Sequence, residues 1–178
     1  LAVTGAITST SDLTIADKII HAGDTNTAIR FPAADTVSVE TGGSERTRVD
    51  SSGRLLVGTS STRSIWGANT KVQLESTDSS SSFSLIRNQA SNAGPWIALC
   101  KSRGASNGSN TIVQDGDSLG SINWFGSDGV DLNNTSAEIR AEIDGTPGSD
   151  DVPGKLLFKT TADGAASPTT RLTITSAG

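Results

Sequence analysis

Residues Gly116–Gly129 read GDSLGSINWFGSDG, with glycine and aspartate at both ends and an apolar patch between them. Within the patch, Ile122 and Trp124 alternate with a serine and an asparagine. A period of two indicates a strand with one covered face, and Gly-Asp pairs favour turns. The stretch therefore predicts one strand between two glycine turns, with Ile122 and Trp124 facing a core or an oligomer interface.

The same alternation recurs along the chain, while helical periodicity is almost missing. Gly, Ser, Asn, Asp and Thr interrupt most windows of ten residues, and these residues favour turns. The expected strands cover residues 13–15, 18–20, 28–31, 36–40, 46–49, 54–57, 71–75, 82–87, 96–101, 111–114, 119–125, 137–143, 155–160 and 171–175. We therefore predict an all-β fold of short antiparallel strands and hairpins, arranged as a β-sandwich or a fibre-like module.

One hairpin pattern occurs twice. Thr36–Gly43 is followed by Arg46–Gly53, and Leu156–Gly164 is followed by Arg171–Gly178. Each pair reads as a strand, a polar glycine turn, a strand that begins with arginine, and a glycine. The repetition indicates a modular β architecture. We expect a boundary near Ser60–Thr62, which gives an N-terminal segment of residues 1–62 and a β-rich module of residues 63–178.

The composition favours an oligomer. Hydrophobic residues make up 34% of the chain and aromatic residues 4%, whereas a globular domain usually has roughly 45–50% apolar residues. A core this small struggles to offset the backbone entropy of folding, about 1–2 kcal/mol per residue. We expect association to bury surface that one chain leaves open. Met is absent and the first residue is Leu, so we also expect a piece of a longer protein.

Charge and cysteine content exclude several classes of protein. The net charge of -5 argues against nucleic-acid partners, which require clustered Lys and Arg. No apolar run approaches the roughly 20 residues of a membrane span, so no membrane insertion is expected. The single cysteine, Cys100, excludes an internal disulfide. Because it ends the apolar run Trp96–Cys100, we expect its side chain to be buried.

Acidic residues near the opening stretch raise the question of a metal site. Calcium takes about 6–8 oxygen ligands at close spacing, but Asp115 and Asp117 are separated from Asp128 by the predicted strand. Turn chemistry accounts for these aspartates without a metal. We therefore expect structural turns, no metal ligands and no calcium requirement for folding.

Sequence signals for catalysis are weak. Gly104–Gly108 matches the G-x-S-x-G string of hydrolases, but no helical pattern follows it, and His21 is the only histidine. Glu138, Glu142 and Asp144 alternate to one face of a strand, which suits a solvated face as well as a pair of glycosidase carboxylates. We predict a solvated face, no catalytic residues and no cofactor.

The three tryptophans are candidates for ligand contact. Trp96 and Trp124 lie in apolar runs, so we expect them in a core or an oligomer interface. Trp66 stands in a loop-like stretch and is the better candidate for a surface platform that stacks on a sugar.

Two parts of the sequence resemble a known group of proteins. His21–Gly53, followed by Leu55–Thr59, resembles repeats in tail-fibre and related virion structural proteins of tailed bacteriophages, especially marine ones. Gly116–Gly129, Ala141–Gly148 and Pro153–Gly164 resemble a second module of the same fibres. The motifs are patterns of turns and strands, which are specific for fibre-like β proteins and say little about a ligand.

The resemblance implies a parallel homotrimer on the virion, in contact with other virion proteins. Its implied role is structural, with a contribution to host-cell attachment. An endosialidase-type chaperone often follows this module, and the position after Gly178 is where it would follow. Two other functions stay open. One is a carbohydrate-binding head that uses loops 103–110 and 126–134 on a host surface glycan, and the other is a glycan depolymerase.

Overall fold

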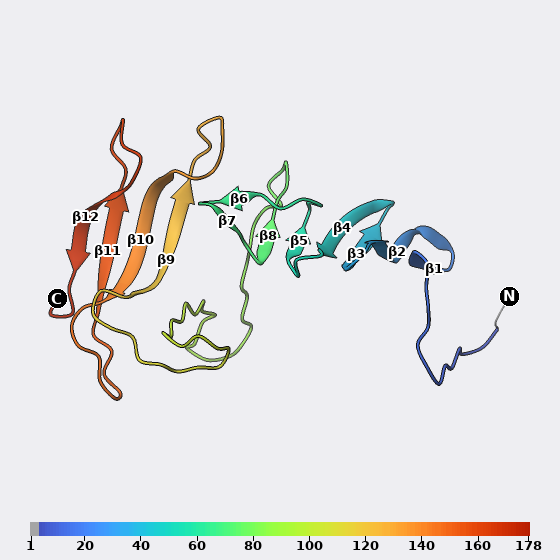
Figure 1. Cartoon of the computed structure of the whole chain (residues 1–178), viewed down its shortest axis with the longest axis horizontal. Helices are drawn as coiled ribbons and strands as arrows, with labels where there is room; N and C mark the ends of the chain where they lie inside the picture. The colour runs from blue at the N-terminus through green and yellow to red at the C-terminus, as the bar shows by residue number, and fades with distance from the viewer. Residues whose placement is uncertain (1–3) are drawn as a thin grey trace. The chain divides into compact units, whose positions relative to one another are not determined.

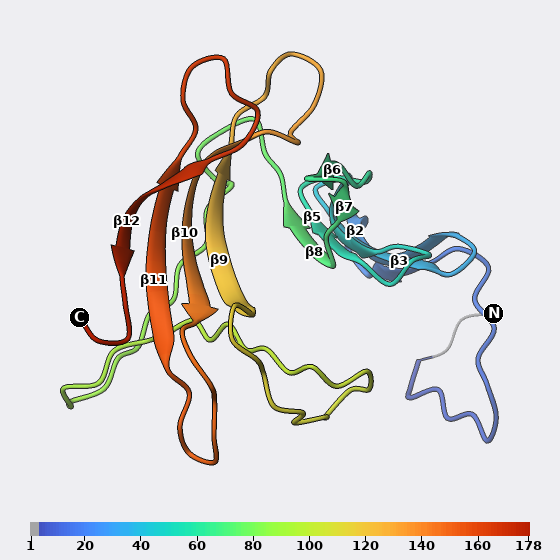
Figure 2. The same cartoon turned by 60° about the vertical axis from the view of Figure 1, so that its left-hand side comes forward.

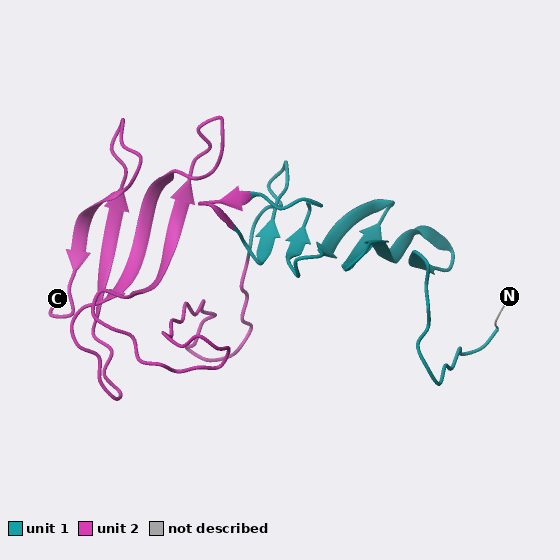
Figure 3. Ribbon diagram, viewed as in Figure 1, with its two compact units in different colours: residues 1–63, 69–83 teal, residues 64–68, 84–178 magenta. Residues whose placement is uncertain are grey.

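The computed structural model describes residues 4–178. All of the regular secondary structure in that range consists of strands (Figure 1). This confirms the all-β prediction. The chain divides into unit 1, residues 1–63 and 69–83, and unit 2, residues 64–68 and 84–178 (Figure 3). None of the described residues belongs to a helix that could cross a membrane.

Unit 1 is built on a six-stranded sheet. Its strands are β1 (Lys18–His21), β2 (Asp24–Ala33), β3 (Thr36–Thr41), β4 (Ser44–Val49), β5 (Leu55–Val57) and β8 (Val72–Leu74). They lie in the order β1-β2-β3-β4-β5-β8, antiparallel except for the parallel pair of β5 and β8. The turn between β3 and β4 holds Gly42 and Gly43 at positive φ, which glycine adopts without steric strain.

The two faces of this sheet differ in character. One row of register neighbours crosses it as Ile19, Ile29, Val39, Thr47, Val57 and Leu74, and a second as Val37, Val49, Leu55 and Val72. The aliphatic members of these rows are 36–57% exposed. On the opposite face, Leu56 and Ser38 are fully buried. Unit 1 thus leaves the apolar face of its sheet open to solvent and shields the more polar face from it.

Unit 2 is built on a four-stranded antiparallel sheet. Its strands are β9 (Ser118–Phe125), β10 (Thr135–Ile143), β11 (Gly154–Thr160) and β12 (Thr169–Ile174). They lie in the order β12-β11-β10-β9, and the β9–β10 and β11–β12 loops leave the sheet at the same end (Figure 2). β9 confirms the single strand predicted within the opening stretch.

Unit 2 repeats the sidedness of unit 1. Ile122, Ile139, Phe158 and Leu172 form one register row across the four strands. Ile122 and Leu172, at the two edges, are 56% and 53% exposed. The opposite face carries the charged residues of β10 and β11. Each sheet therefore presents an apolar face that its own unit leaves largely open, although in unit 2 Leu99 approaches β9 at Gly120.

Most of the predicted strands are confirmed. The repeated hairpin is also confirmed, because β3 pairs with β4 and β11 pairs with β12, each antiparallel. The strands expected at 13–15, 82–87, 96–101 and 111–114 are wrong, since these residues are irregular. A strand needs a ladder of backbone hydrogen bonds to a neighbour, and these residues make only isolated ones, such as Arg103 N to Thr111 O and Ser82 N to Ser80 O.

Three burial predictions need correction. Cys100 is exposed, not buried. Trp96 is 75% exposed and Trp124 49% exposed, so neither belongs to a core of this chain. The cause is the same for all three, because no element of the described chain packs over these side chains. Burial in an oligomer interface, the alternative expected for the two tryptophans, stays a prediction.

Candidate functional site

A short two-stranded ribbon presents an exposed tryptophan. β6 (Ser64–Ile65) pairs with β7 (Ala68–Asn69), and Trp66 and Gly67 form the turn between them. Both have positive φ, 52° and 71°. Such a turn usually takes Asn, Asp or Gly at these positions, and a bulky residue there is strained. Trp66 is nevertheless 67% exposed, so burial does not account for its presence.

The β9–β10 loop holds this turn in place. Trp66 N donates to Leu132 O at 3.2 Å, and Gly67 N donates to Asn133 Oδ1 at 2.9 Å. The loop is itself braced by Asp128, whose carboxylate accepts hydrogen bonds from Val130 N and Asp131 N, which lower its pKa. Trp66 therefore lies in a turn that is hydrogen-bonded to the β9–β10 loop, and Asp128 stabilises that loop.

Behind Trp66 lies a charged floor formed by β10 and β11. Glu138 is 3% exposed, accepts a hydrogen bond from Arg140 Nε at 2.6 Å and forms an ion pair with Lys159 Nζ at 3.3 Å. Arg140 Nη1 reaches Glu142 at 3.3 Å. The expected solvated face is wrong at Glu138, because cross-strand pairing places Lys159 beside it and the three side chains shield one another.

The turn, loop and floor together enclose a hollow of about 270 Å³. Its lining is Trp66, Asn123, Asn133, Thr135, Glu138, Arg140, Lys159, Ala166, Ser167 and Pro168. One aromatic ring, two amides and two hydroxyls thus surround an ion cluster. Among these lining residues Glu138 carries the single carboxylate, whereas glycoside cleavage uses a pair. The arrangement therefore suits the binding of a ligand and not the cleavage of a glycosidic bond.

Sequence reasoning identified Trp66 and the 126–134 loop but missed most of the floor. Lys159 carries no local signal in Lys155–Thr160, since a lysine in an alternating strand usually faces solvent. It enters the site because β11 pairs with β10 in a register that sets Lys159 opposite Glu138. Residues 166–168 enter because the β11–β12 loop leaves the sheet beside the β9–β10 loop.

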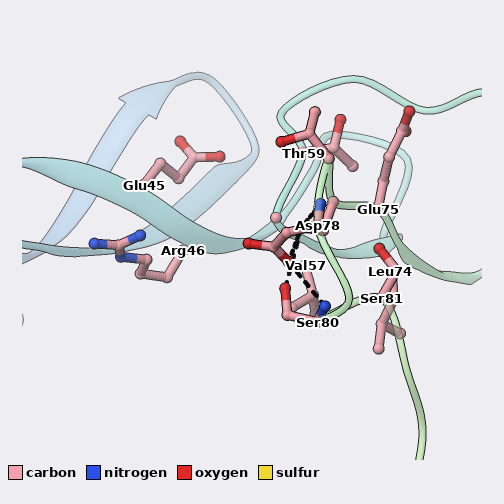
Figure 4. A pocket seen from close by; sticks show the side chains of 12 residues that line it. Glu45, Arg46, Val57, Thr59, Leu74, Glu75, Asp78, Ser80 and Ser81 are labelled. Atoms are coloured by element: carbon pink, nitrogen blue, oxygen red, sulfur yellow. Dashed lines mark hydrogen bonds between the residues drawn. The ribbon is translucent and has the colours of Figure 1, made fainter.

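Unit 1 has a separate hollow of about 590 Å³ between β4, β5 and the serine-rich loop after β8 (Figure 4). Asp78 is the centre of that loop. Its carboxylate accepts Ser76 Oγ at 2.7 Å and Ser80 N at 2.8 Å, and the serine hydrogen bonds lower its pKa to about 2. Gly58 sits where a Cβ would lie 2.2 Å from Glu75 O, so only glycine fits. These contacts account for the loop as a folded turn.

The aspartates of the opening stretch have structural partners. Asp117 accepts Arg103 Nε at 2.7 Å and Arg103 Nη2 at 2.9 Å, and the Arg103 guanidinium is the main cause that lowers the pKa of Asp117 to about 2. Asp115 Oδ1 accepts Gly145 N at 2.8 Å. Within residues 4–178 no three His, Cys, Asp or Glu side chains gather as metal ligands.

The remaining predicted positions stay apart from the hollow at Trp66. Gly104–Gly108 lies in a loop in which Ser106 O accepts the Ser109 hydroxyl, and no helix follows it in the described chain. His21 ends β1 in unit 1 and is exposed. Asp144 accepts Ser176 N at 2.9 Å and Lys155 Nζ at 3.4 Å, which fastens the end of β10.

Comparisons with known proteins bear on the fold. No protein-family model matches the sequence, and no curated protein matches it. Among solved structures, the carboxy-terminal domain of the bacteriophage T5 L-shaped tail fibre aligns with a TM-score of 0.68 and 14% identity, over 100% of this chain and 88% of that one.

A second structure of the same T5 domain, with its intra-molecular chaperone domain, also aligns. The TM-score is 0.68 and the identity 14%, over 97% of this chain and 60% of that longer chain. At this identity the similarity concerns the fold. The chain has the all-β fold of a bacteriophage tail-fibre carboxy-terminal domain.

Proposed function

We propose that this chain is a non-enzymatic structural segment of a bacteriophage fibre, assembled as a parallel homotrimer on the virion. The observation that carries the proposal is the open apolar face of both sheets. In unit 1 alone, the register neighbours Ile29 and Val39 are 46% and 38% exposed, and Val49 in the adjoining row is 46% exposed. An apolar face exposed to water does not stabilise a monomer, whereas its burial in an assembly contributes about 1.5–3 kcal/mol per large aliphatic side chain.

The irregular segment 84–114 of unit 2 supports the same proposal. Within the described chain, residues 95–101 make no backbone–backbone hydrogen bond, although Trp96, Ile97 and Leu99 are 75%, 69% and 55% exposed apolar residues. Extended backbone and apolar side chains need partners when they are ordered. Further copies of the chain are the partners that satisfy both needs at once.

The copy number and the biological role rest on the resemblance to fibre repeats and on the shared fold with a tail-fibre domain. Three copies around one axis let each apolar face meet the next copy in a closed assembly. The fibre would contribute to virion architecture, contact other virion proteins and present its loops for host-cell attachment.

Light scattering after size-exclusion chromatography tests the assembly. At micromolar concentration we expect three times the mass of one chain. A monomer mass would overturn the proposal, and a dimer mass would overturn the trimer while leaving the open faces as the interface.

A glycan depolymerase is the competing enzymatic function. Glu138, Glu142 and Asp144 are each paired with Arg140, Lys155 or Lys159, and these ion pairs account for their positions. We expect no reducing ends to appear when the protein is incubated with bacterial surface polysaccharides. Their release in proportion to protein concentration would establish the enzyme.

A further inference from the structure

We propose that the hollow at Trp66 binds one neutral sugar ring. The inference rests on the attachment role proposed above and supplies the ligand class for it. Its first support is the strain at Trp66. A tryptophan in a left-handed turn is unfavourable where glycine or asparagine would serve, and strained residues concentrate at functional sites.

The geometry makes Trp66 a platform. Its ring lines the hollow while 67% of the residue stays exposed, so one side of the indole is available to a ligand. Two hydrogen bonds, from Trp66 N to Leu132 O and from Gly67 N to the Asn133 side chain, hold the turn before any ligand arrives. A preformed aromatic surface loses little entropy on binding and favours a flat, partly apolar partner.

The polar lining suits hydroxyl groups. In the described chain no hydrogen bond reaches Asn123 Oδ1, Thr135 Oγ1 or Arg140 Nη2, although all three residues line the hollow. These atoms provide an acceptor, a group that both donates and accepts, and a donor. A pyranose ring offers hydroxyls on its edge and C–H groups on its face, which match such a lining and an indole.

Charge compensation favours an uncharged ligand. The Arg140 guanidinium is shared between Glu138 and Glu142, and the Lys159 ammonium is held by Glu138. A carboxylated or phosphorylated sugar would have to compete with these carboxylates for the cations, and Glu138 would repel it. The hollow of about 270 Å³ is smaller than the roughly 300–1,000 Å³ of sites for drug-sized ligands, which indicates a single ring.

The test uses fluorine NMR of protein labelled with 5-fluorotryptophan. The chain has three tryptophans, and Trp96→Phe and Trp124→Phe variants assign their signals. The probes are D-mannose, D-glucose, D-galactose and N-acetyl-D-glucosamine, with N-acetylneuraminic acid as the anionic comparison. We expect at least one neutral sugar to shift the Trp66 signal saturably and leave the other two signals in place.

A pair of variants separates the aromatic contact from the turn. Trp66→Gly removes the ring and suits the positive φ, so the turn is retained. Trp66→Phe keeps an aromatic ring. By calorimetry we expect Trp66→Gly to weaken binding of the active sugar at least about tenfold, and Trp66→Phe to keep affinity within a few-fold.

Light scattering on the same samples keeps the two proposals distinguishable. A trimer in which no neutral sugar shifts the Trp66 signal overturns the sugar site and leaves the fibre role intact. A monomer that binds sugar at Trp66 does the reverse. Full sugar affinity in Trp66→Gly, or tighter binding of N-acetylneuraminic acid than of every neutral sugar, also overturns the inference.

Discussion

β9 and the segment around Trp96 have similar sequences and different structures. Both alternate or cluster apolar residues around a tryptophan, and both predict strands. β9 pairs along its length with β10, whereas residues 96–101 pair with nothing in the described chain (Figure 2). The difference teaches that an alternating apolar segment forms a strand only where a neighbour pairs with it. In the trimer proposed above, that neighbour belongs to another copy.

The largest expected effect tests whether the open face of β9 is an interface. We expect Trp124→Ala to lower thermal stability or release monomers, because removing a buried aromatic residue costs roughly 3–5 kcal/mol per chain. Asp128→Ala removes loop hydrogen bonds and should cost about 1 kcal/mol. Thermal melts with light scattering measure both. If Asp128→Ala were damaging and Trp124→Ala silent, the loop would be the functional element and the structural interpretation would fail.

The next prediction concerns the unpaired segment. Ile97 is 69% exposed within the chain, so a monomer would tolerate its truncation. If another copy covers the segment, Ile97→Ala should destabilise the assembly by about 1.5–3 kcal/mol per chain. Val130→Ala is the matched control, since Val130 is 88% exposed in the β9–β10 loop. Equal trimer stability of both variants would show that Ile97 stays uncovered.

A third prediction addresses the contact between the segment and β9. A Cβ at Gly120 would lie 2.8 Å from Leu99 Cβ, and the φ of 155° there also disfavours a side chain, so Gly120→Ala should cost about 1–3 kcal/mol through overpacking and backbone strain. At Gly94 a Cβ meets nothing within 4 Å, and Gly94→Ala should leave stability unchanged or raise it slightly. Urea unfolding compares the two. Indistinguishable midpoints would mean that Leu99 does not pack on β9.

The smallest effect is a pH dependence. The pKa of Asp117 is lowered to about 2, chiefly by Arg103, from an unfolded value near 3.9. The pair therefore stabilises the fold fully above about pH 4, and its contribution is lost as the pH falls toward 2. The stability difference between wild type and Arg103→Gln should shrink over that range, as measured by urea midpoints.

Arg87→Gln is the control for the acid experiment. The Arg87 guanidinium donates to Gln89 and, within residues 4–178, to no carboxylate, so the stability difference of this variant should not depend on pH between 4 and 2. A constant difference for Arg103→Gln as well would show that the ion pair with Asp117 does not fasten the segment.

The sequence alone determined the local elements and their chemistry. Alternation predicted the strands, and glycine turns predicted the repeated hairpin of β3–β4 and β11–β12. These features depend on residues close in the chain, whose backbone preferences and side-chain periodicity are visible without a fold. The low apolar content likewise predicted that one chain would leave apolar surface open, as both sheets do.

Only the tertiary structure decided which strands found partners and which side chains met. Ser82–Arg87 and Trp96–Lys101 read as strands, yet pairing is a property of a neighbour and not of the segment itself. Glu138 and Lys159 are far apart in the sequence, and the β10–β11 register sets them side by side. The hollow at Trp66 follows from that register and from the loop that holds the turn, because long-range contacts fix geometry that local patterns cannot encode.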